Sequence, residues 1–427
     1  MKVVGLIAEY NPFHNGHLYH IEKAKEITGA DYVIVVMSGN FVQRGTPAIM
    51  PKHIRAEVAL EAGVSLVLEL PVCFAAGSAE YFAAGAISLL ESLGCVDSIC
   101  FGSECGDYDI LEKIAHVTSD EPEEYKELLK KYLSTGYSFP LARQQALQEY
   151  FQIDTMTEVL EQPNNILGIE YIKALYKRKS HMKAYTIKRI VSEYHDDTLN
   201  SGYSSASAIR KLLAFTGRSL RLENDGVFDE PSLSEVLTRL ESEVPKECIR
   251  FLEDTHYTRY PLYANDFSSI LKYKLLTETK ETLSEYLDIS KDLANRIMNQ
   301  RNQFITIDQF CNLLKTKDTT YARISRCLTH ILLNIKSTDM LLYKKHGYCQ
   351  YARVLGFRKD GKKLLSTIKK YSDTPLITKL SQAESLSETG QRMINQDIFA
   401  ADLYESIVTD KFKQPFISEY SQQIIRV

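Results

Sequence analysis

Short apolar runs alternate with longer segments of helical periodicity over the first hundred residues. Apolar runs rich in β-branched residues predict buried strands at 3–8, 32–37, 66–70 and 98–102. Helices are expected between them, at 16–27, 52–62 and 78–93. Repeated strand–helix–strand units of this kind predict an α/β fold with a Rossmann-like, doubly wound parallel sheet.

The pattern changes after residue 102. A charged helical stretch at 107–150 precedes a helix at 167–178 and one more strand at 184–190. A polar stretch from Thr216 to Pro231 predicts a linker. Beyond it the helices are expected at 268–276, 293–301, 307–314 and 321–335. We therefore expect a sheet domain over 1–216, a mostly helical domain over 232–345, and a small α/β extension over 346–427.

Composition places the chain among soluble proteins. Hydrophobic residues make up 44% of the 427 and charged residues 25%, as in average globular domains. No apolar run approaches the roughly 18–20 residues that span a bilayer, so we expect a cytoplasmic protein without a membrane partner. The eight cysteines form no CxxC pair and several lie in apolar stretches. We interpret them as buried small hydrophobes in a reducing compartment.

Charge is distributed unevenly along the chain. Residues 296–370 contain sixteen Lys or Arg and only four Asp, a local net charge of +12 in a chain of net charge −4. A solvated helical surface usually mixes both signs. The excess therefore favours a polyanionic partner, nucleic acid, for this part of the molecule. No protein partner is evident from the sequence.

The residues that carry chemistry follow the first strand, in the turn from Glu9 to His17. Ligands of open parallel sheets bind at the carboxyl ends of strands, and the free N–H groups of the next helix attract phosphate. Gly16 lets the backbone approach closely. His14 and His17 would donate hydrogen bonds to phosphate oxygens, or act as cations when protonated. Either role suits a reaction in which negative charge builds on an α-phosphate.

A metal site is the alternative interpretation of this turn. His14, His17 and His20 recur every three residues, yet no carboxylate or Cys completes a recognised ligand set. No metal ligand is therefore predicted, and His20 on its own is interpreted as a residue of the helix face.

An H-x-G-H turn after the first strand resembles the HxGH nucleotidyltransferase superfamily. That superfamily has a second phosphate-binding motif, S-S/T-x-x-[IV]-[RK], and this chain has Ser204-Ser205-Ala206-Ser207-Ala208-Ile209-Arg210. Ser205 takes the first position and Ala206 replaces the second hydroxyl. Hydroxyls and a cation at a helix start can hold the β- and γ-phosphates, which makes Ser205, Ser207 and Arg210 candidate nucleotide ligands.

Longer blocks resemble the tRNA(Met) cytidine acetate ligase family. The resemblance runs from residue 3 to beyond 400 and is weakest at 107–150 and 217–262. Its blocks begin at Ile7, Met37, Glu69, Phe101, Pro163, Lys188, Tyr194, Tyr321 and Arg353, the block from Tyr194 reading Tyr194-His195-Asp196.

The resemblance implies an enzyme, a ligase with His14 and His17 as its catalytic residues. Such an enzyme activates acetate with ATP as acetyl-adenylate, with Mg²⁺ expected beside ATP, and acetylates N4 of the wobble cytidine of elongator tRNA(Met). The ATP site carried over by matching motifs consists of Ile7, Ala8, Glu9, Tyr10, Asn11, Pro12, Phe13, His14, Asn15, Gly16, His17, Leu18, Tyr19, His20, Gly102, Asn164 and Arg189. Asn165 is the alternative to Asn164.

The loop after the second strand is expected to line a small acetate pocket. Its candidate residues are Asn40, Gln43, Arg44 and Lys52, for which ordinary loop polarity is the alternative. Arg323 and Arg326 share one face of a predicted helix and are candidates for contacting tRNA. Two other functions remain open: a small-molecule adenylyl or cytidylyl transferase of the same superfamily, and a non-catalytic RNA-binding protein with a relict nucleotide fold.

Overall fold

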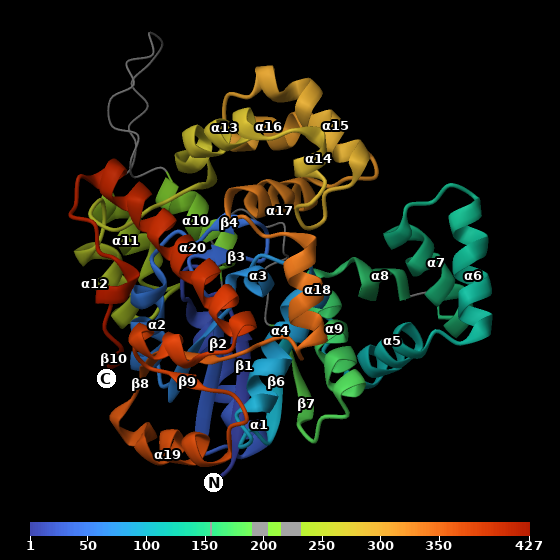
Figure 1. Cartoon of the computed structure of the whole chain (residues 1–427). Coiled ribbons are helices and arrows are strands. Elements are labelled where there is room, and N and C mark those ends of the chain that lie inside the picture. Colours follow the sequence, from blue (N-terminus) through green and yellow to red (C-terminus); the bar gives the residue numbers. More distant parts are fainter. Residues whose placement is uncertain (154–155, 190–203, 215–231) are drawn as a thin grey trace.

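The computed structural model describes residues 1–153, 156–189, 204–214 and 232–427 (Figure 1). The predicted linker from Thr216 to Pro231 and the block Tyr194-His195-Asp196 lie outside the described residues.

Five parallel strands form the centre of the molecule, in the spatial order β5-β2-β1-β6-β7. Their bounds are β1 Val3–Ala8, β2 Tyr32–Ser38, β5 Leu66–Leu70, β6 Ser98–Ser103 and β7 Lys183–Lys188. Each coincides with a predicted strand to within two residues at either end. The predicted α/β class with a mainly parallel sheet is confirmed.

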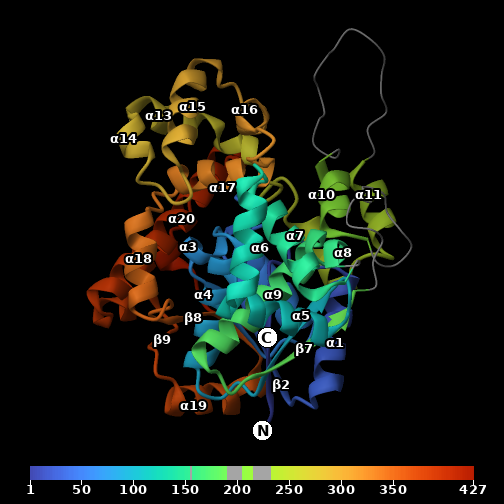
Figure 2. The same ribbon diagram turned by 90° about the vertical axis from the view of Figure 1, so that its right-hand side faces the viewer.

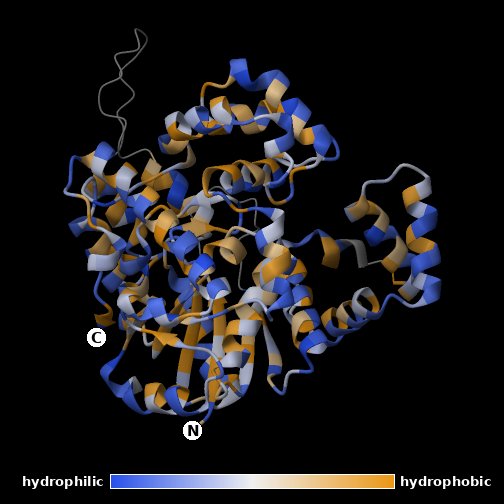
Figure 3. Cartoon of the chain, in the orientation of Figure 1, coloured by the Kyte–Doolittle hydropathy of each residue, from blue (hydrophilic) through white to orange (hydrophobic). Residues whose placement is uncertain are grey.

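Helices cover both faces of this sheet because its strands are apolar on both sides. Val4 and Leu6 of β1 belong to one buried cluster, together with residues of α1 (Asn15–Thr28) and α2 (Lys52–Glu61). Val3 belongs to the cluster on the opposite face, together with residues of α4 (Ala79–Ser92) and α9 (Pro163–Arg178). Successive residues of a strand point to opposite faces, so the continuous apolar runs build a double-sided core, which is orange in Figure 3.

The C-terminal residues complete the same sheet. Strand β8 (Ala352–Phe357) pairs antiparallel with β5, and β9 (Leu376–Ile377) and β10 (Ile425–Arg426) pair parallel with β8. A strand at the edge of a sheet leaves its N–H and C=O groups unpaired, and β8 satisfies those of β5. The strands expected in a small extension over 346–427 therefore belong to the first sheet. The division into three domains stays a prediction.

Most of the other helices form three groups around the sheet (Figures 1 and 2). An arm projects to the right in Figure 1, made of α5 (Tyr108–Asp120), α6 (Glu123–Ser134), α7 (Phe139–Phe151) and α8 (Met156–Glu161). A second group is α10 (Ala206–Ala214), α11 (Leu233–Leu240) and α12 (Lys246–Asp254). A third lies at the top, made of α13 (Ser268–Thr277), α14 (Lys280–Leu283), α15 (Lys291–Gln300), α16 (Ile307–Leu314) and α17 (Tyr321–Leu332). The chain continues with α18 (Ser337–Lys345), α19 (Lys362–Tyr371) and the long α20 (Glu388–Phe412).

The basic stretch 296–370 is divided between the two ends of the molecule. Helices α15 to α17 lie at the top in both views, whereas α19 lies at the bottom beside the N-terminus (Figures 1 and 2). The Thr367 hydroxyl is 3.9 Å from the Met1 sulfur, which fixes α19 at that end. The sixteen cations thus do not form one continuous surface.

Among the described residues, no helix has both the length and the apolarity needed to cross a membrane. All eight cysteines are free thiols, and six of them are buried. Burial raises the pKa of Cys100 and of Cys248 to about 12, so these two thiols remain protonated at neutral pH. This agrees with their interpretation as small core residues.

Candidate active site

The two histidines of the H-x-G-H turn cap helix α1. The Gly16 N–H donates to Nδ1 of His14 (3.1 Å), and the His14 N–H donates to Nδ1 of His17 (3.2 Å). These bonds satisfy amides that a helix start leaves open. A ring nitrogen that accepts a hydrogen bond carries no proton, so each neutral imidazole has its proton on Nε2. The cap therefore leaves two Nε2–H groups as donors.

Both histidines are uncharged at neutral pH. Burial, with the nearby Arg189 and Arg210, lowers the pKa of His14 to about 3. Burial, with His14 and Arg189, holds the pKa of His17 well below its usual range. Of the two roles that the sequence left open, the structure supports the hydrogen-bond donor, while the positive charge of the site comes from the two arginines.

The second phosphate motif docks directly onto the first. Ser205 Oγ accepts the Ala208 N–H (3.1 Å) at the start of α10. One guanidinium nitrogen of Arg210 donates to the Asn11 carbonyl (2.6 Å) and another to Ser207 Oγ (3.0 Å). Two motifs almost two hundred residues apart in the sequence therefore form one site.

Arg189 reaches the histidines from the end of β7. Its N–H donates to the Ser103 carbonyl (2.9 Å), continuing the ladder between β6 and β7. A Cβ atom at Gly102 would lie 3.1 Å from Cγ of Arg189. A side chain at position 102 would therefore crowd Arg189, and the nucleotide contact implied for Gly102 stays a prediction.

Asn164 and Asn165 both contact Glu104, but in different ways. Asn165 is buried, and its side-chain oxygen accepts the N–H groups of Glu104 (2.9 Å) and Cys105 (3.1 Å). The half-buried Asn164 makes a single side-chain bond, from Nδ2 to Glu104 Oε1 (2.6 Å). Because Asn165 is committed to the loop after β6, Asn164 is the better candidate for a ligand contact.

The two arginines of the site have no acidic partner in the part of the chain that the structure describes. Among the described residues, no carboxylate lies within 4.0 Å of the guanidinium of Arg189 or Arg210. Burial lowers the pKa of each, while Glu104 and Glu9 respectively oppose the change. Arginine stays charged in proteins, so the positive charge of these two half-buried side chains has no paired anion within the described part of the chain. A polyphosphate supplies such an anion.

The apolar residues of the turn support the histidines. The Tyr10 ring lies 4.8 Å from the Phe13 ring and 4.9 Å from the His17 ring, centre to centre. His20, one helical turn further on, faces the backbone of Cys100 in β6, and burial lowers its pKa to about 4. Among the described residues, no three His, Cys, Asp or Glu side chains could share a metal ion, so the three histidines do not form the metal site considered as an alternative.

The loop after β2 forms a hairpin that contacts the histidine turn. Strands β3 (Phe41–Val42) and β4 (Thr46–Pro47) pair antiparallel. The Gln43 N–H donates to Glu9 Oε1 (2.9 Å), and the exposed Arg44 feels the charge of the same carboxylate. Asn40 is buried, and its side-chain oxygen accepts the Lys52 N–H (2.8 Å). Gln43 and Arg44 are thus beside the histidine turn, whereas Asn40 supports the base of the hairpin.

Lys52 does not line an acetate pocket, contrary to the expectation. Its side chain is 1% exposed, and its ammonium lies 2.7 Å from Glu69 and 2.6 Å from Glu419. Arg353 of β8 contacts the same two carboxylates. We call Lys52, Glu69, Arg353 and Glu419 the buried charge network. Two cations facing two anions neutralise one another, which leaves the Lys52 ammonium committed to the core.

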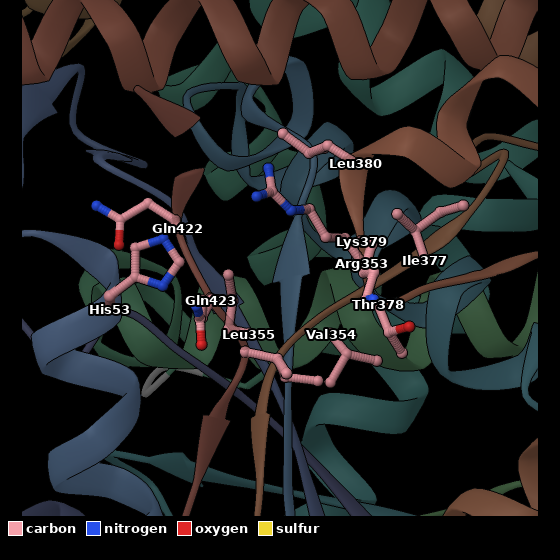
Figure 4. Close-up of a pocket in the computed structure, with 11 residues that line it drawn as sticks. His53, Arg353, Val354, Leu355, Ile377, Thr378, Lys379, Leu380, Gln422 and Gln423 are labelled. Atoms are coloured by element: carbon pink, nitrogen blue, oxygen red, sulfur yellow. The ribbon is translucent and has the colours of Figure 1, made fainter. Parts of the chain in front are cut away.

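A pocket opens beside the buried charge network, on the side away from the histidine turn. Figure 4 shows His53 of α2 and Arg353 of β8 on its wall, with Thr378, Lys379 and Gln422 from the C-terminal segment. None of the residues predicted for the site lines it. This pocket therefore belongs to the join between the C-terminal strands and the sheet.

Arg323 and Arg326 lie on α17, as predicted, but in different surroundings. Arg323 is exposed. Arg326 is half-buried, its Nε has no hydrogen-bond partner among the described residues, and burial lowers its pKa against the opposing charge of Asp288. Of the two, Arg323 is available to a partner on the surface.

Arg55 is a residue of the site that sequence reasoning missed. It is buried in α2 and donates to the carbonyls of Glu9 (2.5 Å), Ser38 (3.1 Å), Gly39 and Met50 (3.0 Å). It thereby ties the ends of β1 and β2 together. A single Arg in an amphipathic helix carries no signal of this role, because its partners are main-chain carbonyls brought near only by the fold.

Comparison with known proteins identifies the family of this chain. The sequence profile described as HIGH Nucleotidyl Transferase matches residues 1–418. A tRNA(Met) cytidine acetate ligase of Acetivibrio thermocellus is 41% identical over 428 residues, covering 100% of both chains. One of Clostridium perfringens is 40% identical over 412 residues, covering 95% of each.

Two crystal structures of Thermotoga maritima TmcAL are similar over the whole chain, both at 32% identity. The form bound with alpha-thio ATP has a TM-score of 0.88 and covers 100% of this chain and 99% of that one. The apo form has a TM-score of 0.90 and covers 100% of both.

The chain therefore belongs to the HIGH nucleotidyl transferase family. Its predicted kinship with the tRNA(Met) cytidine acetate ligases within that family is confirmed.

Proposed function

We propose that this chain is an ATP-dependent tRNA(Met) cytidine acetate ligase. In the first step it activates acetate as acetyl-adenylate, and in the second it transfers the acetyl group to N4 of the wobble cytidine of elongator tRNA(Met). The observation that carries the proposal is the pair of neutral, capped histidines beside Arg189 and Arg210, two half-buried arginines without a salt bridge to any described residue.

These residues fit ATP. His14 and His17, at the start of α1, offer Nε2–H donors. Arg189 and Arg210 supply the positive charge that three phosphates require. Ser205, Ser207 and Asn164 complete the polar lining. The form of the Thermotoga maritima relative bound with alpha-thio ATP supports assigning a nucleotide to this fold.

In the proposed first step an acetate oxygen attacks the α-phosphorus of ATP. The new P–O bond forms as the bond to the β-phosphate oxygen breaks, and pyrophosphate leaves with the electron pair. His14 and His17 stabilise the charge on the α-phosphate oxygens by hydrogen bonds. Donors already oriented by the helix cap need no reorganisation during the reaction.

Acetate has only a methyl group and a carboxylate, so few residues can contact it and select it. Gln43 and Arg44 of the hairpin are the remaining candidates, because Asn40 and Lys52 are committed to buried contacts. Arg44 would hold the carboxylate until the mixed anhydride has formed.

In the proposed second step N4 of cytosine attacks the acetyl carbon. The bond to the adenylate oxygen breaks, AMP leaves, and N4 loses a proton. Sequence-specific proteins read RNA bases mostly in unpaired loops, which suits a base of the anticodon. The exposed Arg323 of α17 would bind a backbone phosphate. A tRNA substrate implies a cytoplasmic enzyme.

Mg²⁺ is proposed to accompany ATP, where it would neutralise charge on the phosphates. Because no three acidic or ligating side chains among the described residues could share a metal ion, the phosphates themselves would provide most of its ligands.

One experiment tests the proposal. Pyrophosphate release from ATP is measured with and without acetate, followed by transfer of labelled acetate to bulk tRNA. Acetate-dependent release and labelled tRNA are expected. Release that requires another phosphoryl or nucleotide acceptor would indicate a small-molecule nucleotidyltransferase, and no turnover at all would indicate a non-catalytic RNA-binding protein.

A further inference from the structure

The turn of the β3–β4 hairpin is held from two sides by different parts of the molecule. On one side the Gln43 N–H donates to Glu9 of the histidine turn. On the other side the Gly45 carbonyl accepts the Ser325 hydroxyl (2.7 Å) and the Thr329 hydroxyl (2.7 Å), both from α17. We call Gly45, Ser325 and Thr329 the clasp.

At the clasp two side-chain hydroxyls donate to one carbonyl, and the backbones of the hairpin and α17 approach each other closely. Gly45 has a φ of +70°, and a Cβ atom there would lie 2.4 Å from both the Cα and the N of Arg326. Only glycine allows this conformation and this approach. Both hydroxyl donors are buried, and two bonds occupy both lone pairs of the Gly45 carbonyl.

The clasp determines where Arg44 lies. Arg44 is the single residue between the two anchors, the Gln43 N–H and the Gly45 carbonyl. The positive charge of Arg44 contributes to lowering the pKa of Arg210. The Glu9 carboxylate opposes the lowering of the pKa in both Arg44 and Arg210. A shift of α17 would therefore move the hairpin turn relative to the residues proposed to hold ATP and acetate.

The join between the hairpin and the helices at the top is not completely filled. A small pocket lies beside the clasp, between the hairpin and the helices at the top of the molecule. Its walls are Phe41, Gly45, Pro47, Phe267, Leu328 and Thr329.

Helix α17 also presents Arg323 to solvent, on the side where the proposed function places tRNA. We propose that Ser325 and Thr329 are positioning residues, and that the clasp couples a polyanion bound on α17 to the hairpin over the adenylation site. This inference rests on the proposed function. Coupling between two sites is reciprocal, so tRNA and acetate with ATP should each raise the affinity for the other.

The test measures that coupling. The Kd for tRNA is measured with and without acetate plus a non-hydrolysable ATP analogue, and the KM for acetate in pyrophosphate release is measured with and without tRNA. The full chain is compared with the double variant Ser325→Ala with Thr329→Val. We expect coupling of about ten-fold in the native chain, typical of linked sites, and a factor near one in the double variant.

Matched variants separate positioning from stability. Thr118→Val removes a buried hydroxyl that donates to the Ile114 carbonyl (2.8 Å) in α5, far from the clasp in the sequence, and should keep the coupling. Thr329→Ser retains the donor and should also keep it. Should the double variant fail to fold, Ser325→Ala alone, which leaves the Thr329 bond, should show reduced coupling.

The proposal is overturned if the native chain shows a coupling factor of one. It is equally overturned if the double or single clasp variant couples like Thr118→Val. Neither result touches the proposed function, which fails only when the native chain releases no pyrophosphate in response to acetate.

Discussion

Two groups of charged side chains lie at the central sheet, one around β5 and β8 and the other beyond β1 and β7, and they differ in balance. In the buried charge network, Lys52 and Arg353 face Glu69 and Glu419, and every charge has an opposite partner. Around the histidine turn, Arg189 and Arg210 face neutral imidazoles and lack salt bridges to the described residues. A balanced group stabilises the fold, whereas an unbalanced one has binding energy left for an anion.

The largest effect is expected from unbalancing the network. Lys52→Met leaves two buried carboxylates facing one arginine, and the free energy of unfolding should fall by about 3–5 kcal/mol, measured by urea denaturation. The double variant Lys52→Met with Glu69→Leu keeps the pair of Arg353 and Glu419 and should recover most of the loss. A cost below about 1 kcal/mol for the single variant, within the range of a surface ion pair, would contradict a structural role for the network.

Removing a donor from the histidine turn should instead affect activity more than stability. His17→Ala is expected to lower acetate-dependent pyrophosphate release by about 10²–10³-fold, the usual effect of losing one oriented donor. Stability should fall only by about 1 kcal/mol for the lost cap. His20→Gln, on the same helix but facing β6, is the matched control. An equal loss of activity in both variants would refute the special role of His17.

The histidine turn and the buried charge network should also lose their contributions to stability in different pH ranges. Histidines that stay neutral in the folded chain, with a pKa of about 3 for His14 and about 4 for His20, take up protons on unfolding below pH 6.5. The unfolded state then binds more protons, so stability falls as the pH falls. Each histidine should contribute about 2 kcal/mol to the loss between pH 7.5 and pH 5.

The network should respond only at lower pH. Burial would raise the pKa of Glu419, but Lys52 and Arg353 outweigh burial and hold that pKa well below its usual range. The stabilisation that ionised Glu419 contributes is complete above about pH 4.5 and is lost as the pH falls through more acidic values. Urea denaturation of the native chain and His20→Gln checks both statements, and parallel curves from pH 7.5 to 5 would exclude the histidine contribution.

An exposed cation of α17 should show the smallest effect. Arg323→Gln removes one proposed phosphate contact, so the slope of log K for tRNA against log salt should fall by about one. Lys130→Gln on the projecting arm, also exposed, is the matched control. Acetate-dependent pyrophosphate release should be the same in both, and an unchanged salt slope for Arg323→Gln would remove α17 from the tRNA surface.

Prediction from the sequence was most accurate where the signal was local. The apolar runs of β1, β2, β5 and β6 marked the strands, because a strand buried on both faces must be apolar throughout. The histidine turn and Ser205 to Arg210 were found because their chemistry lies in consecutive residues. Strand β8 lies in the segment that was expected to form a separate extension, since no local pattern states which edge a strand will join.

Charges were the hardest feature to interpret from the sequence. Lys52 and Arg44 are both cations next to the same loop, yet one is buried against two carboxylates and the other is exposed. Glu419, which neutralises Lys52, lies more than three hundred residues away in the chain. The role of an ionisable side chain depends on its burial and its neighbours, and neither can be deduced from position in the sequence.

The sequence by itself determined the α/β class, the two phosphate motifs and the family, because each depends on residue types in a short, ordered pattern. Only the tertiary structure decided that the histidines are neutral donors, that Arg189 and Arg210 carry the charge, and that Gly45 binds α17. These properties arise from desolvation and from contacts between distant segments, which exist only once the chain has folded.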